Sequence, residues 1–270
     1  MAEGLRKRVT TAVVLVAILL AVLLWLPPIA TVIALTLIVL AGAWEWSAFL
    51  HASGIAFRLL YVALIAVLLP VIWQLTAQPA GRDALLFVAL AWWIIALAWV
   101  VFAPRRVSWW SAALAGVLAL VPAWLALTRM RLDFVRGAEW VLFALILVWV
   151  ADIGAFFVGR RYGHTRLAPK VSPGKTWEGV AGGTVASAVV ALIGSGWFDI
   201  PAARFVPLCI AAVAFSIVGD LTESLLKRFA GVKDSGTLFP GHGGVMDRID
   251  SVTGAAPVLF LGLVTLGVSP

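Results

Sequence analysis

The sequence of 270 residues is 63% hydrophobic and 12% charged, and its mean hydropathy is +1.07. A soluble domain needs far more charge on its surface, so this composition excludes a soluble protein and places the chain in lipid. The formal net charge of +7 therefore indicates membrane topology and attraction to anionic lipid or nucleotide, and we expect no nucleic-acid partner.

Nine apolar stretches are each close to the roughly 20 residues that a helix needs to cross the hydrocarbon core. They do not alternate in polarity as membrane strands do. The predicted helices span about 9–26, 29–49, 57–76, 84–103, 109–128, 139–159, 177–197, 205–228 and 251–268. The sequence thus predicts an all-α fold, a polytopic transmembrane helix bundle of about nine membrane helices.

The distribution of basic residues predicts the topology. With the N-terminus inside, 15 of the 20 Lys and Arg fall in cytoplasmic segments. The first stretch follows Arg6, Lys7 and Arg8 without a convincing small-residue cleavage site, so we expect a retained span. The two longest loops, about 160–176 and 229–250, then lie on the same side of the membrane, which predicts a shared site.

The two parts of the chain differ in polarity. Residues 1–140 are nearly pure apolar helix with tryptophans at several helix ends, as in an interfacial belt. We interpret residues 1–140 as scaffold helices, with dimer contacts as a candidate role. Residues 141–270 are the expected catalytic region with its cytoplasmic loops.

An acidic residue, Asp220, interrupts the eighth apolar stretch. A carboxylate inside a membrane helix is costly and usually faces a polar interior, so we expect a function for Asp220. Four further polar residues share its helical face, namely Ser216, Glu223, Ser224 and Lys227. Glu223 also has a simpler interpretation, because it can pair with Lys227 four residues later.

A glycine-rich segment, residues 233–251, leads into the last helix. Flexible backbone at Gly243 and Gly244 can approach a phosphate closely, and His242 is a candidate substrate contact without zinc-site spacing. Asp247 and Asp250 are three residues apart and can project together as hard oxygen ligands suited to Mg²⁺. Helix capping is the alternative role for one of these two aspartates.

An earlier segment repeats this pattern, with the intramembrane acid Asp152 followed by the basic residues Arg160 and Lys175. The Gly-Lys-Thr triplet at 174–176 is no phosphate-binding loop, because the earlier glycine at fixed spacing and the preceding strand are missing. Arg160 and Lys175 are candidate phosphate contacts, but ordinary positive-inside charge explains them equally well. No motif that activates a serine is visible, which fits attack by the substrate's own phosphate.

Residues 224–250, SLLKRFAGVKDSGTLFPGHGGVMDRID, closely resemble the signature of the phosphatidate cytidylyltransferase (CDP-diacylglycerol synthase) family. The segments DIGAFFVGR at 152–160 and SPGKTWEG at 172–179 resemble two further blocks of that family. The signature shows no departure from the family pattern, whereas residues 1–140 add only hydropathy.

The resemblance implies a reaction of CTP with phosphatidate that gives CDP-diacylglycerol and pyrophosphate. It also implies Mg²⁺ as the cofactor, with K⁺ as a candidate second cation, a homodimer, and a place in the plasma (inner) membrane of a bacterium. By this resemblance Asp220 and Asp247 would be the metal ligands. Our own hypothesis adds Asp250 or Asp152 in support of them. The implied phosphate-binding residues are Lys227, Arg228, Lys233 and Arg248, with Ser224 in the same pocket.

Other functions remain open at this point. A CTP-dependent lipid kinase or a cytidylyltransferase for another lipid phosphate would need the same charged site. A CDP-alcohol phosphotransferase is disfavoured, because its Asp-Gly, Ala-Arg and paired-Asp pattern is missing. An ion-coupled transporter would also carry intramembrane acids, but no inverted repeat is visible and the charges gather on one face.

Overall fold

The computed structural model describes residues 13–14, 16–50, 54–236, 238 and 243–268. Eight helices of this part of the chain are long and apolar enough to cross a membrane, which confirms the predicted all-α polytopic bundle. They are α2 (Pro28–Ser47), α3 (Ile55–Leu75), α4 (Pro79–Phe102), α5 (Trp109–Asp133), α6 (Gly137–Tyr162), α7 (Trp177–Trp197), α8 (Ala202–Phe229) and α9 (Met246–Thr265). The short 3₁₀ helix η1 (Ala48–Leu50) follows α2, and residues 16–24 are helical within the predicted first span.

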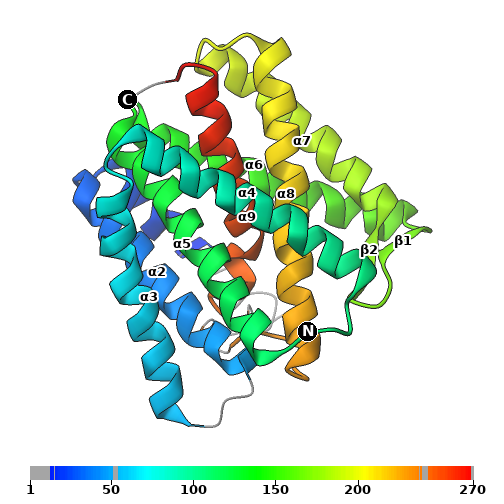
Figure 1. Ribbon diagram of the computed structural model, residues 1–270. Coiled ribbons are helices and arrows are strands. Elements are labelled where there is room, and N and C mark those ends of the chain that lie inside the picture. Colours follow the sequence, from blue (N-terminus) through cyan, green and yellow to red (C-terminus); the bar gives the residue numbers. More distant parts are fainter. Residues whose placement is uncertain (1–12, 15, 51–53, 237, 239–242, 269–270) are drawn as a thin grey trace.

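α5 and α9 form the centre of the bundle. Seventy-two per cent of the apolar stretch of α5 and 61% of that of α9 are buried, against 17% for α3. In Figure 1, α2 and α3 lie on one side of the bundle, whereas α7 and a small hairpin lie on the other. The helices of the N-terminal part pack directly on those of the C-terminal part, α5 against α9 and α4 against α8. The functional division near residue 140 stays a prediction.

Three helix boundaries differ from the prediction by about five residues, and one of them is the start of α4, which lies at Pro79 rather than near 84. α5 was expected to end near 128 but continues to Asp133, because Arg129 is buried and stacks on Trp73, with 3.7 Å from its guanidinium carbon to the ring centroid. Arg129 also donates to the carbonyl oxygen of Thr76 at 3.0 Å, which satisfies the end of α3. α9 begins at Met246 rather than near 251, so the predicted acidic pair lies inside its first turns.

The predicted loop 160–176 contains an antiparallel hairpin of β1 (Arg166–Ala168) and β2 (Ser172–Thr176). Thr176 ends the hairpin and caps α7, since its hydroxyl accepts from the Gly179 amide at 3.1 Å. The hairpin thereby fixes Lys175 at the start of α7. The segment that precedes α9 lies at the same end of the bundle, because Arg228 at the end of α8 donates to Val171 in the hairpin at 3.4 Å.

Candidate active site

A cavity of about 660 Å³ opens between α6, α7, α8, α9 and the hairpin. Acidic side chains from three helices line it: Asp152, Asp220, Asp247 and Asp250. Basic side chains on α6 and the hairpin line it as well: Arg160, Arg166 and Lys175. The structure therefore brings six predicted site residues together and adds Arg166, which the sequence analysis did not single out.

Glycine lets α8 and α9 approach closely at the cavity. A Cβ on Gly219 would lie 2.4 Å from the carbonyl oxygen of Asp250, and a Cβ on Gly254 would lie 2.1 Å from that of Phe215. Asp220, which follows Gly219, is near enough to Asp250 for their charges to interact. Asp152 on α6 interacts with the charge of Asp220 in the same way. Carboxylates from three helices thus converge at one place, as the sequence predicted.

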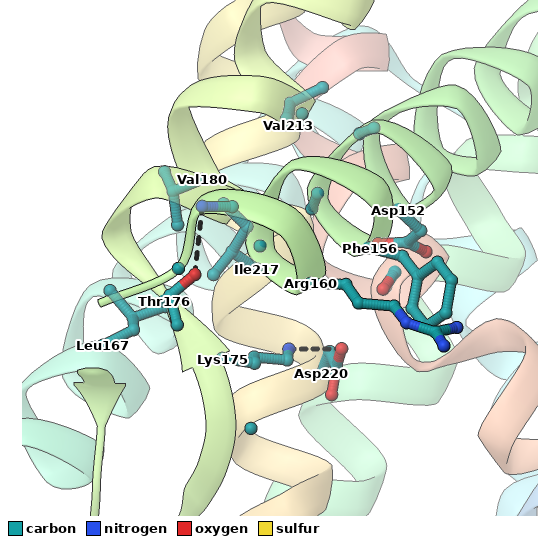
Figure 2. Close-up of a pocket in the computed structure, with 18 of the residues that line it drawn as sticks. Asp152, Phe156, Arg160, Leu167, Lys175, Thr176, Val180, Val213, Ile217 and Asp220 are labelled. Carbon is teal, nitrogen blue, oxygen red and sulfur yellow. Dashed lines mark hydrogen bonds and ion pairs between the residues drawn. The ribbon is translucent and has the colours of Figure 1, made fainter. Parts of the chain in front are cut away.

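Lys175 forms an ion pair with Asp220 across the cavity, from β2 to α8 (Figure 2). Both side chains are partly exposed, at 27% and 25%. Ser224, one helical turn after Asp220, donates to the same carboxylate at 3.4 Å. Since Lys175 contacts an acid of the cavity, the site interpretation of this lysine is favoured over positive-inside charge alone.

Lys227 is held between two acids. Its Nζ donates to Asp247 Oδ1 at 2.8 Å and forms an ion pair with Glu223, one turn earlier on α8. The Glu223 side chain is 0% exposed. The pairing of Glu223 with Lys227 therefore agrees with the simpler interpretation of Glu223, while Lys227 links it to an acid of the cavity.

The second oxygen of Asp247 is bound by the glycine-rich segment. The backbone amides of Gly244 and Ser235 donate to Oδ2 at 2.8 and 3.0 Å. Gly243 has a positive φ of 80°, and a Cβ there would lie 2.5 Å from Oδ2, so this position requires glycine. Gly243 and Gly244 therefore fix the Asp247 carboxylate in the structure, and their predicted contact with a phosphate stays a prediction.

The remaining predicted residues lie around this core in different ways. Arg248 is exposed and its charge interacts with Asp152. Arg228 is exposed and reaches the hairpin, and Lys233 is exposed after α8; within the described chain neither lines the cavity. His242 lies outside the described residues, so its contact with substrate stays a prediction.

The carboxylates of the cavity suit Mg²⁺ only if a bound substrate supplies further oxygen ligands. Within the described chain, no three acidic, histidine or cysteine side chains stand close enough together to hold a metal by themselves. Mg²⁺ in nucleotide sites is commonly bound through one or two carboxylates, with water and phosphate oxygens completing the octahedron. The cavity offers carboxylates of this kind, namely Asp220, Asp247, Asp152 and Asp250.

The sequence analysis missed Glu45, on α2. Its side chain is buried, and its carboxylate accepts from the amides of Val245 and Met246 at 3.0 and 2.8 Å. The argument that singled out Asp220, a carboxylate inside an apolar helix, applies equally to Glu45. Glu45 was missed because residues 1–140 were interpreted as scaffold.

Comparison with known proteins identifies the family to which the chain is similar. A family model described as the cytidylyltransferase family matches residues 6–266. The chain is 39% identical to a phosphatidate cytidylyltransferase of Haemophilus influenzae, over 94% of this chain and 96% of the relative. It is 42% identical to a phosphatidate cytidylyltransferase of Pseudomonas aeruginosa, over 94% of this chain and 95% of that relative.

Proposed function

The chain belongs to the cytidylyltransferase family, and from this premise we propose that it transfers CMP from CTP to phosphatidate in phospholipid biosynthesis. A phosphate oxygen of phosphatidate forms a bond to the α-phosphorus of CTP, and the bond from that phosphorus to the bridging oxygen of the β-phosphate breaks. The products are CDP-diacylglycerol and pyrophosphate. The observation that carries the proposal is the match, along nearly the whole chain, to relatives named phosphatidate cytidylyltransferase.

The charges of the cavity suit two anionic reactants. Arg160, Arg166 and Lys175 line its walls and reduce the repulsion between the phosphates of CTP and phosphatidate. Lys227, hydrogen-bonded to Asp247, places a further cation beside the acids. No protein nucleophile is needed, because the lipid phosphate attacks, and the protein contributes positioning and electrostatic stabilisation.

Metal dependence is a further part of the proposal. Asp220 and Asp247 would hold Mg²⁺, supported by Asp250 or Asp152, and K⁺ is a candidate second cation. Bound Mg²⁺ would supply charge compensation to the α-phosphate and to the departing pyrophosphate. The carboxylates alone repel the nucleotide, so the cations of the cavity are required for binding.

The walls of the cavity suit a substrate pair of mixed polarity. Apolar side chains of the helices, such as Ala155, Val180 and Val213, line one region of the cavity. The hairpin lines another region and contributes charged side chains to it. Phe156 at its edge is 57% exposed on a membrane helix. We infer that the lipid enters sideways from the bilayer and that CTP enters from the hairpin side, which the positive-inside rule predicts to face the cytoplasm. A homodimer in the bacterial inner membrane is part of the same proposal.

Product analysis with two labelled nucleotides tests the proposed reaction. Purified protein receives phosphatidate, Mg²⁺ and CTP labelled either at the α- or at the γ-phosphorus. The proposal predicts lipid-extractable label only from the α-position, with pyrophosphate released in equal amount. Lipid label from the γ-position would instead identify a CTP-dependent lipid kinase and would contradict it.

A further inference from the structure

We propose that Glu45, on the N-terminal helix α2, is a positioning residue that holds the glycine-rich segment and the start of α9 so that Asp247 faces the cavity. The inference deepens the proposed function, on which its activity readout rests. By this inference, a helix of the N-terminal part of the chain helps to set the geometry of the site.

The first step is the capping of α9 by another helix. The first amides of a helix have no partner within the helix, and a negative charge at that end is stabilising. Val245, at the start of α9, has an apolar side chain that cannot cap. Glu45, which belongs to α2, caps α9 instead. Its carboxylate accepts from the amides of Val245 and Met246 at 3.0 and 2.8 Å, and the residue is only 6% exposed.

The second step is the link from Glu45 to Asp247 through Ser235. The Ser235 hydroxyl lies 2.8 Å from Glu45 Oε2 and 3.0 Å from Asp247 Oδ2. A hydroxyl has one proton and can donate to only one of these carboxylates at a time. The Ser235 amide donates to Asp247 as well, at 3.0 Å. A shift of the Glu45 carboxylate therefore moves the segment that binds Asp247.

The third step is the fit of glycine backbone against Glu45. A Cβ on Gly236 would lie 2.4 Å from Glu45 Oε1, and a Cβ on Gly244 would lie 2.3 Å from Glu45 Oε2. The carboxylate cannot swing aside freely, because three hydrogen bonds hold it. The close packing at these two glycines depends on the place that Glu45 occupies.

The helix that carries Glu45 is itself firmly held. Trp46, 1% exposed, donates from its indole to the Ala112 carbonyl of α5 at 2.8 Å. Arg58 donates to the Trp44 carbonyl at 2.9 Å and lies over the Trp44 ring at 4.0 Å. A carboxylate on such a rigid support can fix the geometry of a neighbouring segment.

The decisive variant is Glu45→Gln, which keeps the shape but replaces one acceptor oxygen by an NH₂ group that faces other donors. We expect kcat to fall at least about tenfold, the effect of losing a hydrogen bond to a charged group. KM for phosphatidate should stay within about threefold, because the cations of the cavity are unchanged. Glu45→Asp restores a carboxylate and should recover the rate several-fold over Glu45→Gln.

The matched control is Glu139→Gln. Glu139 accepts from the Trp197 indole at 2.7 Å near the start of α6, whereas the first residue of that helix that lines the cavity is Ala151. At 1.5 Å per residue these positions are about 18 Å apart. We expect the control to keep wild-type kcat.

Hydrogen exchange of the peptide covering residues 243–250 tests directly whether Glu45 holds the start of α9 in place. The amides of Val245 and Met246 should exchange about tenfold faster in Glu45→Gln than in the wild type or the control. Unchanged exchange, or wild-type kcat in Glu45→Gln, would overturn the inference. If the wild type made no CDP-diacylglycerol, the proposed function would fail, and hydrogen exchange would still decide the role of Glu45.

A second variant covers the case in which Glu45→Gln does not fold. Gly236→Ala leaves Glu45 in place but sets a methyl group against its carboxylate, so kcat should fall in the same direction. Gly196→Ala on α7 is its control, because a Cβ there meets nothing within 4 Å, and this variant should keep wild-type kcat. Equal kcat in the Gly236→Ala and Gly196→Ala variants would contradict the proposed contact.

Discussion

Lys227 joins α8 to α9 by donating to Asp247 Oδ1 at 2.8 Å while it also forms an ion pair with the fully buried Glu223. A single cation is thus shared between one acid of the cavity and one acid of the core. The side chain of Lys227 is itself only 13% exposed. This arrangement makes Lys227 important for stability as well as for the site.

Lys227→Met should destabilise the protein by about 3 kcal/mol, because it leaves the charge of Glu223 buried without its partner. Denaturant unfolding in detergent measures the loss. The double variant Lys227→Met with Glu223→Gln should recover most of the stability but not the activity, since Asp247 still lacks its cation. Recovery of both properties would show that Lys227 has no part in catalysis.

Gly219→Ala should destabilise the protein by about 1–3 kcal/mol, because its methyl group would collide with the Asp250 carbonyl and push α8 away from α9. Activity should fall with it, since Asp220 and Asp250 would separate. Gly196→Ala on α7 is the control, as its Cβ meets nothing within 4 Å. The unfolding midpoints of the two variants give the comparison, and equal midpoints would refute the close approach of the helices.

Lys175→Met separates the two interpretations of the basic hairpin. Lys175 contacts Asp220, whereas Lys170 lies exposed between the strands. If both lysines only set topology, their replacements would behave alike. We expect Lys175→Met to lower kcat/KM about 10- to 100-fold, as for loss of an electrostatic contact to the reacting phosphates, and Lys170→Met to leave it near wild type. Steady-state assays with CTP as the varied substrate measure this.

Removal of Mg²⁺ by a chelator should abolish turnover, and added Mg²⁺ should restore it, because the carboxylates of the cavity otherwise repel the nucleotide phosphates. Calorimetry gives a second readout. CTP should bind about tenfold or more weakly without Mg²⁺. Undiminished activity in excess chelator would rule out metal dependence.

Much of the fold follows from the sequence, because hydropathy over about 20 residues is a local property. Helix α7 was predicted to span 177–197 and does so. The end of α5 was placed too early, because the charge of Arg129 looks incompatible with a span until its stacking on Trp73 is known. The hairpin was not predicted, since Ser172-Pro173-Gly174 is typical of a loop.

The convergence of the acids was predictable, but the positions of their partners were not. An intramembrane carboxylate signals a polar interior, which singled out Asp152 and Asp220, and both line the cavity. The ion pair from Lys175 to Asp220 depends on the packing of β2 on α8, which no local pattern encodes. Glu45 carried the same signal as Asp220, but its partners lie 190 to 201 residues further along the chain.

The catalytic role of the converging carboxylates is tested most directly by Asp220→Asn and Asp247→Asn, assayed for transfer of α-labelled CMP to phosphatidate. Asp83→Asn is the control, because Asp83 pairs with its neighbour Arg82 near the start of α4, while Val100 near its other end packs beside the hairpin. The account predicts that each site variant stays folded in detergent and loses turnover, whereas the control keeps it. Full turnover in both site variants would contradict the account.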